Sequence, residues 1–438
     1  MPTASVSERR AWYIYDWANS AFSTTVVTLF LGPYLTAIAK SAAATDGFLH
    51  IFGIPLEPRA YWSFLVSLSV ITQVLVMPLV GSLADYGHRK KEMLGALTYT
   101  GALATMAMFF VQGKDYLLGG ALFLAANLAF GCAVVVYNSF LPEIAEPADR
   151  DAVSSRGWAI GYIGGGALLA LNLAFFSNAV KLGVSEGFAV RLSIASAGVW
   201  WALFTFPAMR HLQNRGTQRS LPLDQNILTV GWRQFRNTVG KLRAYPQTML
   251  FLAAYLCYND AIQTVISLAG QFGSDELKMP MSQLSLAILM VQFVAFFGAM
   301  GFGKVAAVLT AKKAVMISLG IWTATLVYMY LAVTTPRDFF ILAALVGVVM
   351  GGSQALSRAI FAQLVPTGAE AEYFSIYEIA DKGTSWMGPL VVGFALQLTG
   401  QYRLAILSLI FFFVVGSILL SRVDVERGSR EAQHEQRH

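Results

Sequence analysis

The chain has 438 residues, of which 56% are hydrophobic and only 13% charged, and its formal net charge is +6. Soluble globular domains carry about a quarter charged residues, so this composition excludes an ordinary soluble enzyme or nucleic-acid-binding domain. It indicates a chain that crosses a membrane many times.

Apolar stretches long enough to cross a bilayer recur along the whole chain. A transmembrane helix needs about 17–25 mostly apolar residues. This criterion predicts twelve spans, near residues 12–38, 61–85, 92–112, 116–141, 157–178, 189–209, 247–271, 282–303, 313–334, 338–362, 373–398 and 402–421. The expected fold is therefore all-α and integral to the membrane.

The positive charges of the loops set the expected orientation. An even number of spans puts both termini on one side, and 21 of the 31 Lys and Arg residues lie in the termini and loops of that side. Because short cytoplasmic loops are rich in Lys and Arg, both termini are predicted to be cytoplasmic. This asymmetry, with attraction to lipid headgroups, explains the net charge, so no nucleic-acid partner is expected.

The first predicted span carries an acidic residue near its start. Asp16 lies in the run YDWANSAF (residues 15–22), about two turns after the basic pair Arg9 and Arg10. A charge in hydrocarbon costs at least about 2.5–3.5 kcal/mol, so Asp16 either caps a helix at the interface or has a function. Its position in the cytoplasmic third of the span favours a gate or helix-packing role over solute binding.

A polar, basic stretch between the sixth and seventh spans divides the chain in two. We expect an N-terminal six-helix bundle at residues 1–210, a cytoplasmic linker at 211–246, and a C-terminal bundle with a short tail at 247–438. Transporters built from two such repeats hold their solute between the halves near the midplane. A single offset of +222 supports the repeat, because it aligns residues 81–91 with 303–313, and Gly161 and Gly166 with Gly383 and Gly388.

The seventh span contains an acidic residue at its centre. Asp260 has 13 span residues before it and 11 after it. Because removal from water disfavours a charged carboxylate, such a group can take up and release a proton as the two bundles move. The alternative is a neutral Asp that hydrogen-bonds to a neighbouring helix.

Neutral polar side chains at similar depth are expected to line a solute cavity. The spacing of Asn259, Asp260 and Gln263 puts these three on one helical face. Amides suit a zwitterion or another small polar solute, although they also bridge helices structurally. The candidate solute- and proton-binding residues are Asp260, Asn259, Gln263, Tyr258, Gln354, Gln292, Gln73 and Asn127.

A second set of charged residues lies one to two turns from the predicted cytoplasmic face. Glu378 and Lys382 are four residues apart and can neutralise one another. Arg358 has an alternative role, because a bidentate guanidinium also suits a solute carboxylate. We expect the set to form a gate of ion pairs that break when this side opens: Asp16, Asp85, Arg89, Glu143, Arg156, Arg358, Glu378, Asp381 and Lys382.

No His lies within a predicted span, so no His is expected to bind a metal or to act as an acid or base inside the membrane. All five His residues lie in loops or tails, and Cys132 and Cys257 suit the role of small apolar fillers within spans. No metal, no cofactor and no enzyme activity is therefore expected.

Several motifs resemble one family of membrane proteins. GSLADYGHRKK at residues 81–91 is similar to the loop signature of the major facilitator superfamily, in which acidic and basic residues latch the cytoplasmic side. Within that superfamily, YDWANSAF, Tyr258-Asn259-Asp260 and GSQALSR (352–358) resemble the vacuole-effluxer-like branch of autophagy-related amino-acid effluxers. The resemblance covers nearly the whole chain. It implies twelve helices in two pseudo-symmetric bundles, in the plasma (inner) membrane of a bacterium or the vacuolar membrane of a fungus.

These features predict a secondary active transporter. It would move a small polar solute, such as an amino acid, by alternating access and proton-coupled efflux. An uncoupled facilitator or a drug or metabolite exporter is the alternative, and a non-transporting receptor with a transporter fold is a third possibility. The expected partners are the solute, protons and membrane lipid, while the residues indicate no oligomeric state.

Overall fold

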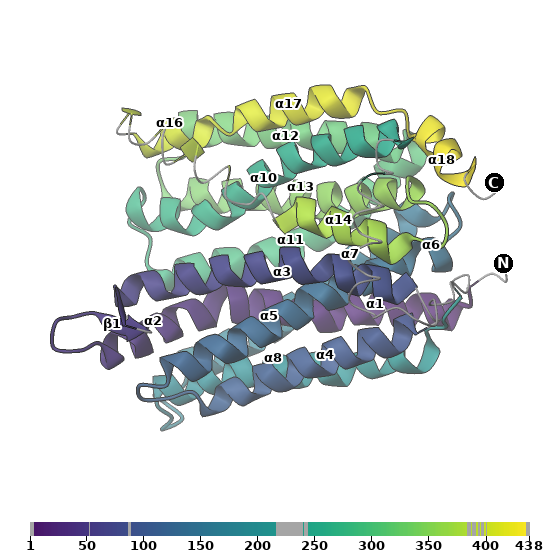
Figure 1. Cartoon of the computed structure of the whole chain (residues 1–438). Coiled ribbons are helices and arrows are strands. Elements are labelled where there is room, and N and C mark those ends of the chain that lie inside the picture. Colours follow the sequence, from purple (N-terminus) through teal and green to yellow (C-terminus); the bar gives the residue numbers. More distant parts are fainter. Residues whose placement is uncertain are drawn as a thin grey trace.

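The protein is a bundle of long helices lying side by side (Figure 1). The computed structural model describes residues 4–51, 53–85, 89–215, 240, 244–382, 387, 391–392, 395, 398–399 and 401–434. The all-α membrane fold expected from the sequence is confirmed.

The first half of the chain forms the first six predicted spans. The opening span is longer than predicted, because helix continues from Val6 to Ala42. An antiparallel hairpin with Leu49 opposite Leu56 follows it. The elements are α1 (Val6–Ala21), η1 (Phe22–Phe30), α2 (Leu31–Ala42), β1 (Leu49–Ile51), β2 (Ile54–Leu56), η2 (Pro58–Ala60), α3 (Tyr61–Asp85), α4 (Lys90–Ala107), η3 (Met108–Phe110), α5 (Tyr116–Ser139), α6 (Leu141–Ile144), α7 (Arg150–Ser177) and α8 (Glu186–His211).

The second half supplies the remaining helices. They are α10 (Pro246–Asp275), α11 (Met281–Val308), α12 (Ala311–Ala332), α13 (Pro336–Gln363), α14 (Glu370–Lys382), α16 (Tyr402–Leu407), α17 (Ile410–Ser421) and α18 (Val425–His434). Among the described residues, 11 helices are long and apolar enough to cross a membrane. The predicted span 373–398 begins within α14 and continues over residues that lie partly outside the description.

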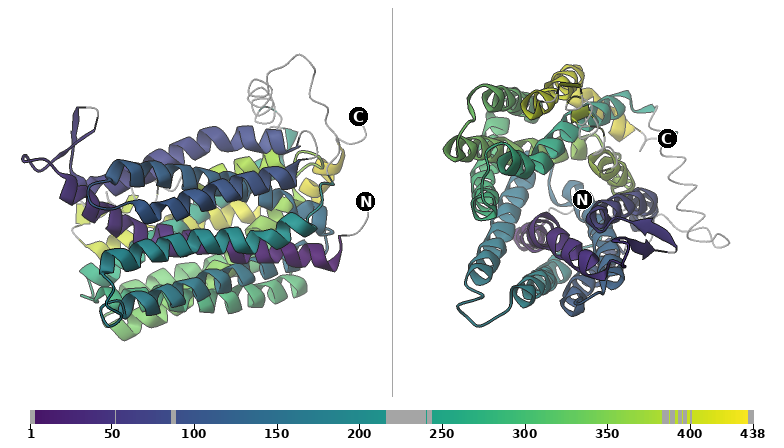
Figure 2. Two further views of the ribbon diagram at one scale, coloured as in Figure 1. Left: turned by 90° about the horizontal axis from the view of Figure 1, so that it is seen from below. Right: turned by 90° about the vertical axis from the view of Figure 1, so that its left-hand side faces the viewer.

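The helices fall into two groups. Helices α1 to α8, which we call the N bundle, lie on one side, and α10 to α18, the C bundle, lie on the other (Figures 1 and 2). The start of α1 and helix α18 lie at the same end of the molecule, the N/C end, while β1 and β2 mark the opposite hairpin end. Most of the predicted linker 211–246 lies outside the described residues, as do Gly383 and Gly388 of the predicted repeat.

Glycines let α7 approach α1 closely. A Cβ on Gly161 would lie 2.8 Å from the Ser20 hydroxyl oxygen, and a Cβ on Gly164 would clash with the backbone oxygen of Trp17. Only the smallest residue permits such an approach between helices. Helix α1, which carries Asp16, is therefore held tightly against α7.

A π-helical segment, η1, interrupts the first span. The Thr24 hydroxyl donates to the Ser20 carbonyl oxygen at 2.9 Å, and the Thr28 hydroxyl donates to the Ser23 carbonyl oxygen at 2.8 Å. Side-chain hydroxyls of this kind compete with the backbone hydrogen bonds of a regular helix. The apolar run at residues 12–38 predicts a single span here, and nothing in that pattern indicates a π-helical segment.

Candidate functional site

Arg358 of α13 reaches across from the C bundle into the N bundle. Its Nε donates to the Ser154 hydroxyl at 2.9 Å, and its Nη2 donates to the Ser154 carbonyl oxygen at 3.0 Å. Nη1 donates to Asn138 Oδ1 at 3.2 Å, and both Nη atoms lie 3.4 Å from Asp16 Oδ2. A guanidinium has five N–H donors, so these five bonds use them all.

Aromatic rings enclose the same guanidinium. Its central carbon lies 4.8 Å from the ring centroid of Trp12, 5.3 Å from that of Trp158 and 5.7 Å from that of Tyr137. Cation–π contacts strengthen when the cation is out of water, and the Arg358 side chain is only 3% exposed. In this conformation Arg358 thus joins the bundles and has no N–H left for a solute carboxylate.

Asn138 extends the Arg358 contacts to α14. Its Nδ2 donates to Glu378 Oε1 at 2.8 Å, while Glu378 Oε2 lies 3.5 Å from Lys382 Nζ. One amide of the N bundle therefore bonds to two helices of the C bundle.

A second contact between the bundles lies nearer the hairpin end. There the Tyr162 hydroxyl of α7 donates to Gln354 Oε1 of α13 at 2.7 Å. Gln354 precedes Arg358 by four residues on the same helix, which corresponds to about 6 Å along its axis.

Lys90 forms the centre of another buried cluster, at the N/C end. Its Nζ lies 2.6 Å from Glu143, 3.1 Å from Asp85 and 3.2 Å from Glu370, and these side chains are 2–4% exposed. Glu370 begins α14 of the C bundle, whereas the other three residues belong to the N bundle. The ammonium therefore links the bundles as Arg358 does.

Asp85 also binds the start of α14 directly. Its two carboxylate oxygens accept the backbone N–H groups of Ala371 at 3.1 Å and Glu372 at 2.8 Å. The first N–H groups of a helix lack partners within the helix, and the helix dipole favours a negative charge there. The end of α3 is thereby fixed to the beginning of α14.

Two basic residues predicted for the gate lie outside these clusters. Arg89 is exposed, and its neighbour Lys90 pairs with Asp85 instead, because α4 begins at Lys90 and turns that side chain inward. Arg156 is likewise exposed, on α7. Asn138 and Ser154, which hold Arg358, escape sequence reasoning because neutral residues of this kind carry no distinctive signal.

Asp381 bonds to two residues of α10 in the C bundle. Its Oδ1 accepts the Tyr255 hydroxyl at 2.7 Å and the Asn259 amide at 2.8 Å, which ties α14 to α10. Asp260 is the next residue along α10 and is 1% exposed. The Tyr258 hydroxyl lies 2.6 Å from that of Ser357 on α13.

The predicted amides occupy several places. Gln73 donates to the Asn127 carbonyl oxygen at 2.7 Å and Asn127 donates to the Ser69 hydroxyl at 2.8 Å, so these amides bridge α3 and α5 within the N bundle. Gln292 of α11 faces Gly166 of α7, where an added Cβ would lie 3.1 Å from the Gln292 Cβ. Gln263 is half-buried on α10.

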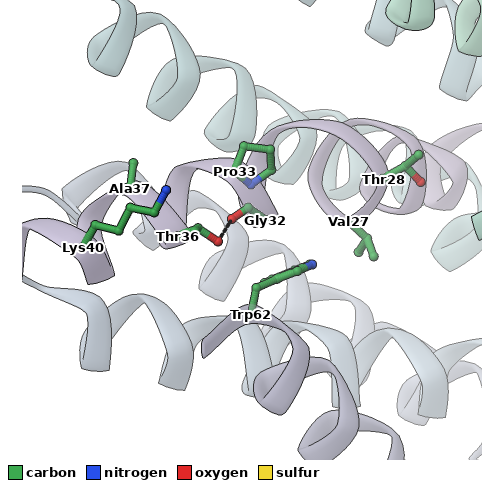
Figure 3. A pocket seen from close by; sticks show the side chains of 8 residues that line it. All are labelled: Val27, Thr28, Gly32, Pro33, Thr36, Ala37, Lys40 and Trp62. Atoms are coloured by element: carbon green, nitrogen blue, oxygen red, sulfur yellow. Dashed lines mark hydrogen bonds between the residues drawn. The ribbon is translucent and has the colours of Figure 1, made fainter. Parts of the chain in front are cut away.

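An open pocket of about 500 Å³ lies in the N bundle, and Figure 3 shows the side chains that line it. None of the predicted solute-binding residues lines it. Its walls come from η1, α2 and the start of α3: Val27, Thr28, Gly32, Pro33, Thr36, Ala37, Lys40 and Trp62.

Comparison with known proteins identifies the family. The family model described as vacuole effluxer Atg22 like matches residues 4–433, which is nearly the entire chain. The chain belongs to this Atg22-like family. The family predicted from the sequence motifs is thereby confirmed.

Known relatives of this Atg22-like chain span its full length. A Bacillus subtilis protein described as an uncharacterised MFS-type transporter, YxiO, is 33% identical over 430 residues, which cover 98% of this chain and 97% of that protein. Autophagy-related protein 22-1 of Penicillium rubens is 26% identical over 545 aligned positions, with 98% and 91% coverage. These relatives make the chain a multi-pass membrane transporter of the major facilitator type.

Solved structures support the same fold for this Atg22-like chain. The major facilitator transporter FucP in its outward conformation has a TM-score of 0.69 at 14% identity, covering 95% of this chain and 98% of FucP.

Proposed function

We propose that this Atg22-like chain is a secondary active transporter that moves a small polar solute by alternating access, in proton-coupled efflux. Its N/C end would be the cytoplasmic side, which the contacts between the bundles hold closed in this conformation. The membrane would be the plasma (inner) membrane in a bacterium or the vacuolar membrane in a fungus.

The Arg358 contacts are the observation that carries this proposal. A cation of the C bundle has every N–H bonded to the N bundle, at a depth where water is excluded. Contacts made of hydrogen bonds and charge can be exchanged for water or for other partners when the bundles separate, so a closed and an open state can interconvert. An interface made only for rigidity would not need a buried charge, which costs free energy to desolvate.

The solute is proposed to be polar, with amino acids as the first candidates. Two polar side chains, Tyr162 and Gln354, meet at the interface on the hairpin side of Arg358. Such groups would be poor partners for an apolar solute, because their hydrogen bonds would be left unmade.

Asp260 is proposed to carry the coupled proton. It is 1% exposed at the middle of α10 and neighbours Asn259, which bonds to α14. The substitution D260N keeps the side chain's shape but removes the titrating group, so it should abolish solute accumulation driven by a pH gradient while leaving exchange without a gradient. D115N, an exposed Asp at the hairpin end, is the matched control. Unchanged pH dependence in D260N would reject Asp260 as the proton carrier.

Reconstituted vesicles test the transport proposal itself. Purified full-length protein in proteoliposomes should exchange a ¹⁴C-labelled mixture of L-amino acids and accumulate it when a pH gradient is imposed. Equal transport without the gradient would favour an uncoupled facilitator. Binding of the mixture without any exchange would favour a receptor.

A further inference from the structure

Lys382 stands apart from the other cations at the interface between the bundles. Arg358 donates five hydrogen bonds, and Lys90 is surrounded by three carboxylates. The Nζ of Lys382, although buried, donates no hydrogen bond to any residue in the described part of the chain. Its contacts there include Glu378 Oε2 at 3.5 Å and the ring of Phe130, whose centroid is 5.3 Å away.

This environment leaves the ammonium group in need of an acceptor. An ammonium has three N–H donors, and taking it out of water without hydrogen bonds is costly. Glu378 satisfies the Lys382 ammonium only in part, because the contact between them is long. The other carboxylate oxygen of Glu378 accepts a hydrogen bond from the Asn138 amide. A negatively charged acceptor is therefore the group that this position would bind most strongly.

The position of Lys382 along α14 suits contact with a solute rather than a role in holding the N/C end closed. Glu370, which contacts Lys90 at the N/C end, precedes Lys382 by twelve residues, or about 18 Å of helix. Lys382 therefore lies on the hairpin side of the Lys90 cluster, away from the contacts that Glu370 makes at the N/C end. Its side chain is 21% exposed, and its flexible stem allows the ammonium to turn towards that exposed side.

We propose that Lys382 binds the carboxylate of the transported solute, in competition with Glu378, which makes the solute a small carboxylate-bearing molecule such as an amino acid. This inference rests on the transport function proposed above. When the solute carboxylate binds the Lys382 ammonium, Glu378 loses that ion pair and keeps the hydrogen bond that the Asn138 amide donates to it. Asn138 in turn accepts a hydrogen bond from Arg358. Glu378 and Asn138 thus connect the proposed binding site to the Arg358 contacts that hold the N/C end closed.

Competition in counterflow tests the inference. In this assay proteoliposomes take up the ¹⁴C-labelled L-amino-acid mixture in the presence of unlabelled competitors. The competitors are either amino acids or the corresponding amides, which lack the carboxylate. A hydrogen bond to a charged group is worth about 1.5–3 kcal/mol, or roughly 10- to 150-fold in affinity. K382Q should therefore raise KM at least tenfold and lose the preference for acids over amides. E378Q, which removes the competing carboxylate, should lower KM several-fold, and K181Q, at an exposed lysine of the hairpin end, should match the wild type.

Other outcomes would overturn the inference. One such outcome is that K382Q lowers only the maximal rate and keeps the preference for acids over amides. Another is that K382Q and E378Q raise KM alike. Either result would mean that Lys382 helps to hold the N/C end closed and does not bind the solute. Thermal stabilisation of the purified protein by the same mixture, compared with the amides, reports binding without transport. Stabilisation by acids that requires Lys382, without counterflow, would refute the transport function and leave Lys382 as a carboxylate-binding residue. Neither stabilisation nor counterflow would refute both proposals.

Discussion

Removing the charge of Asp16 should open the N/C end. In D16N the Asn keeps the size of the side chain, but the Arg358 guanidinium loses its anionic partner while remaining buried, with 3% of its side chain exposed. Breaking a buried ion pair by removing one partner costs about 3–5 kcal/mol. We take about 3 kcal/mol, because the bonds to Ser154 and Asn138 persist. That energy corresponds to a shift of roughly 150-fold from the closed towards the open state.

A buried reporter cysteine measures this shift. Ser375 of α14 has no exposed surface, and a Cβ on Gly81 of α3 would lie 3.0 Å from the Ser375 Cβ, so this side chain lies between the bundles. In a chain with Cys132 and Cys257 replaced by Ala, S375C should react slowly with a permeant maleimide. Adding D16N should raise the reaction rate at least tenfold.

Two further variants make the D16N result decisive. D149N breaks the ion pair with Arg9, in which Asp149 is 52% exposed. Exposed ion pairs are worth about 0–1 kcal/mol. The S375C reaction rate in D149N should therefore rise no more than about fivefold. D16N combined with R358Q removes both charges and should bring the rate back towards the wild type. A D16N rate no higher than that of D149N, in a monodisperse and folded protein, would refute the reasoning.

Two other substitutions follow from the same structure. K90Q should raise the S375C reaction rate and lower the melting temperature, because it leaves three buried carboxylates without their cation. R89Q, at the exposed neighbour, should change neither quantity. Equal effects of K90Q and R89Q would contradict the role given to Lys90. G164A should lower the unfolding free energy by about 1–3 kcal/mol through overpacking against Trp17, whereas G187A, which meets no atom within 4 Å, should not. Thermal unfolding of the purified variants decides between these outcomes.

The helices were predictable because their signal is local. Length and hydropathy suffice to find a span, so the predicted segment 61–85 coincides with α3. The start of α1 at Val6 rather than Trp12 was missed, since its first turns are polar and lie beyond the apolar run. The π segment contains hydroxyls that bond to backbone carbonyl oxygens, and it leaves no pattern that hydropathy detects.

The site was harder to predict because its partners are distant in sequence. Arg358 and Asp16 could be named from their charge at similar depth, and the structure places them in contact. The sequence predicts Arg89 for the gate, whereas in the structure its neighbour Lys90 makes the buried contacts, because which of two adjacent side chains points inward depends on where α4 begins. Depth alone predicts Asp381 for the gate, and the structure shows its bonds to Tyr255 and Asn259 of α10.

Uptake by the wild-type protein tests the central claim most directly. Proteoliposomes with an imposed pH gradient should accumulate the ¹⁴C-labelled L-amino-acid mixture above its equilibrium level, and a protonophore should abolish that accumulation. Uptake and exchange no greater than in protein-free liposomes would contradict the proposal that this chain transports such solutes.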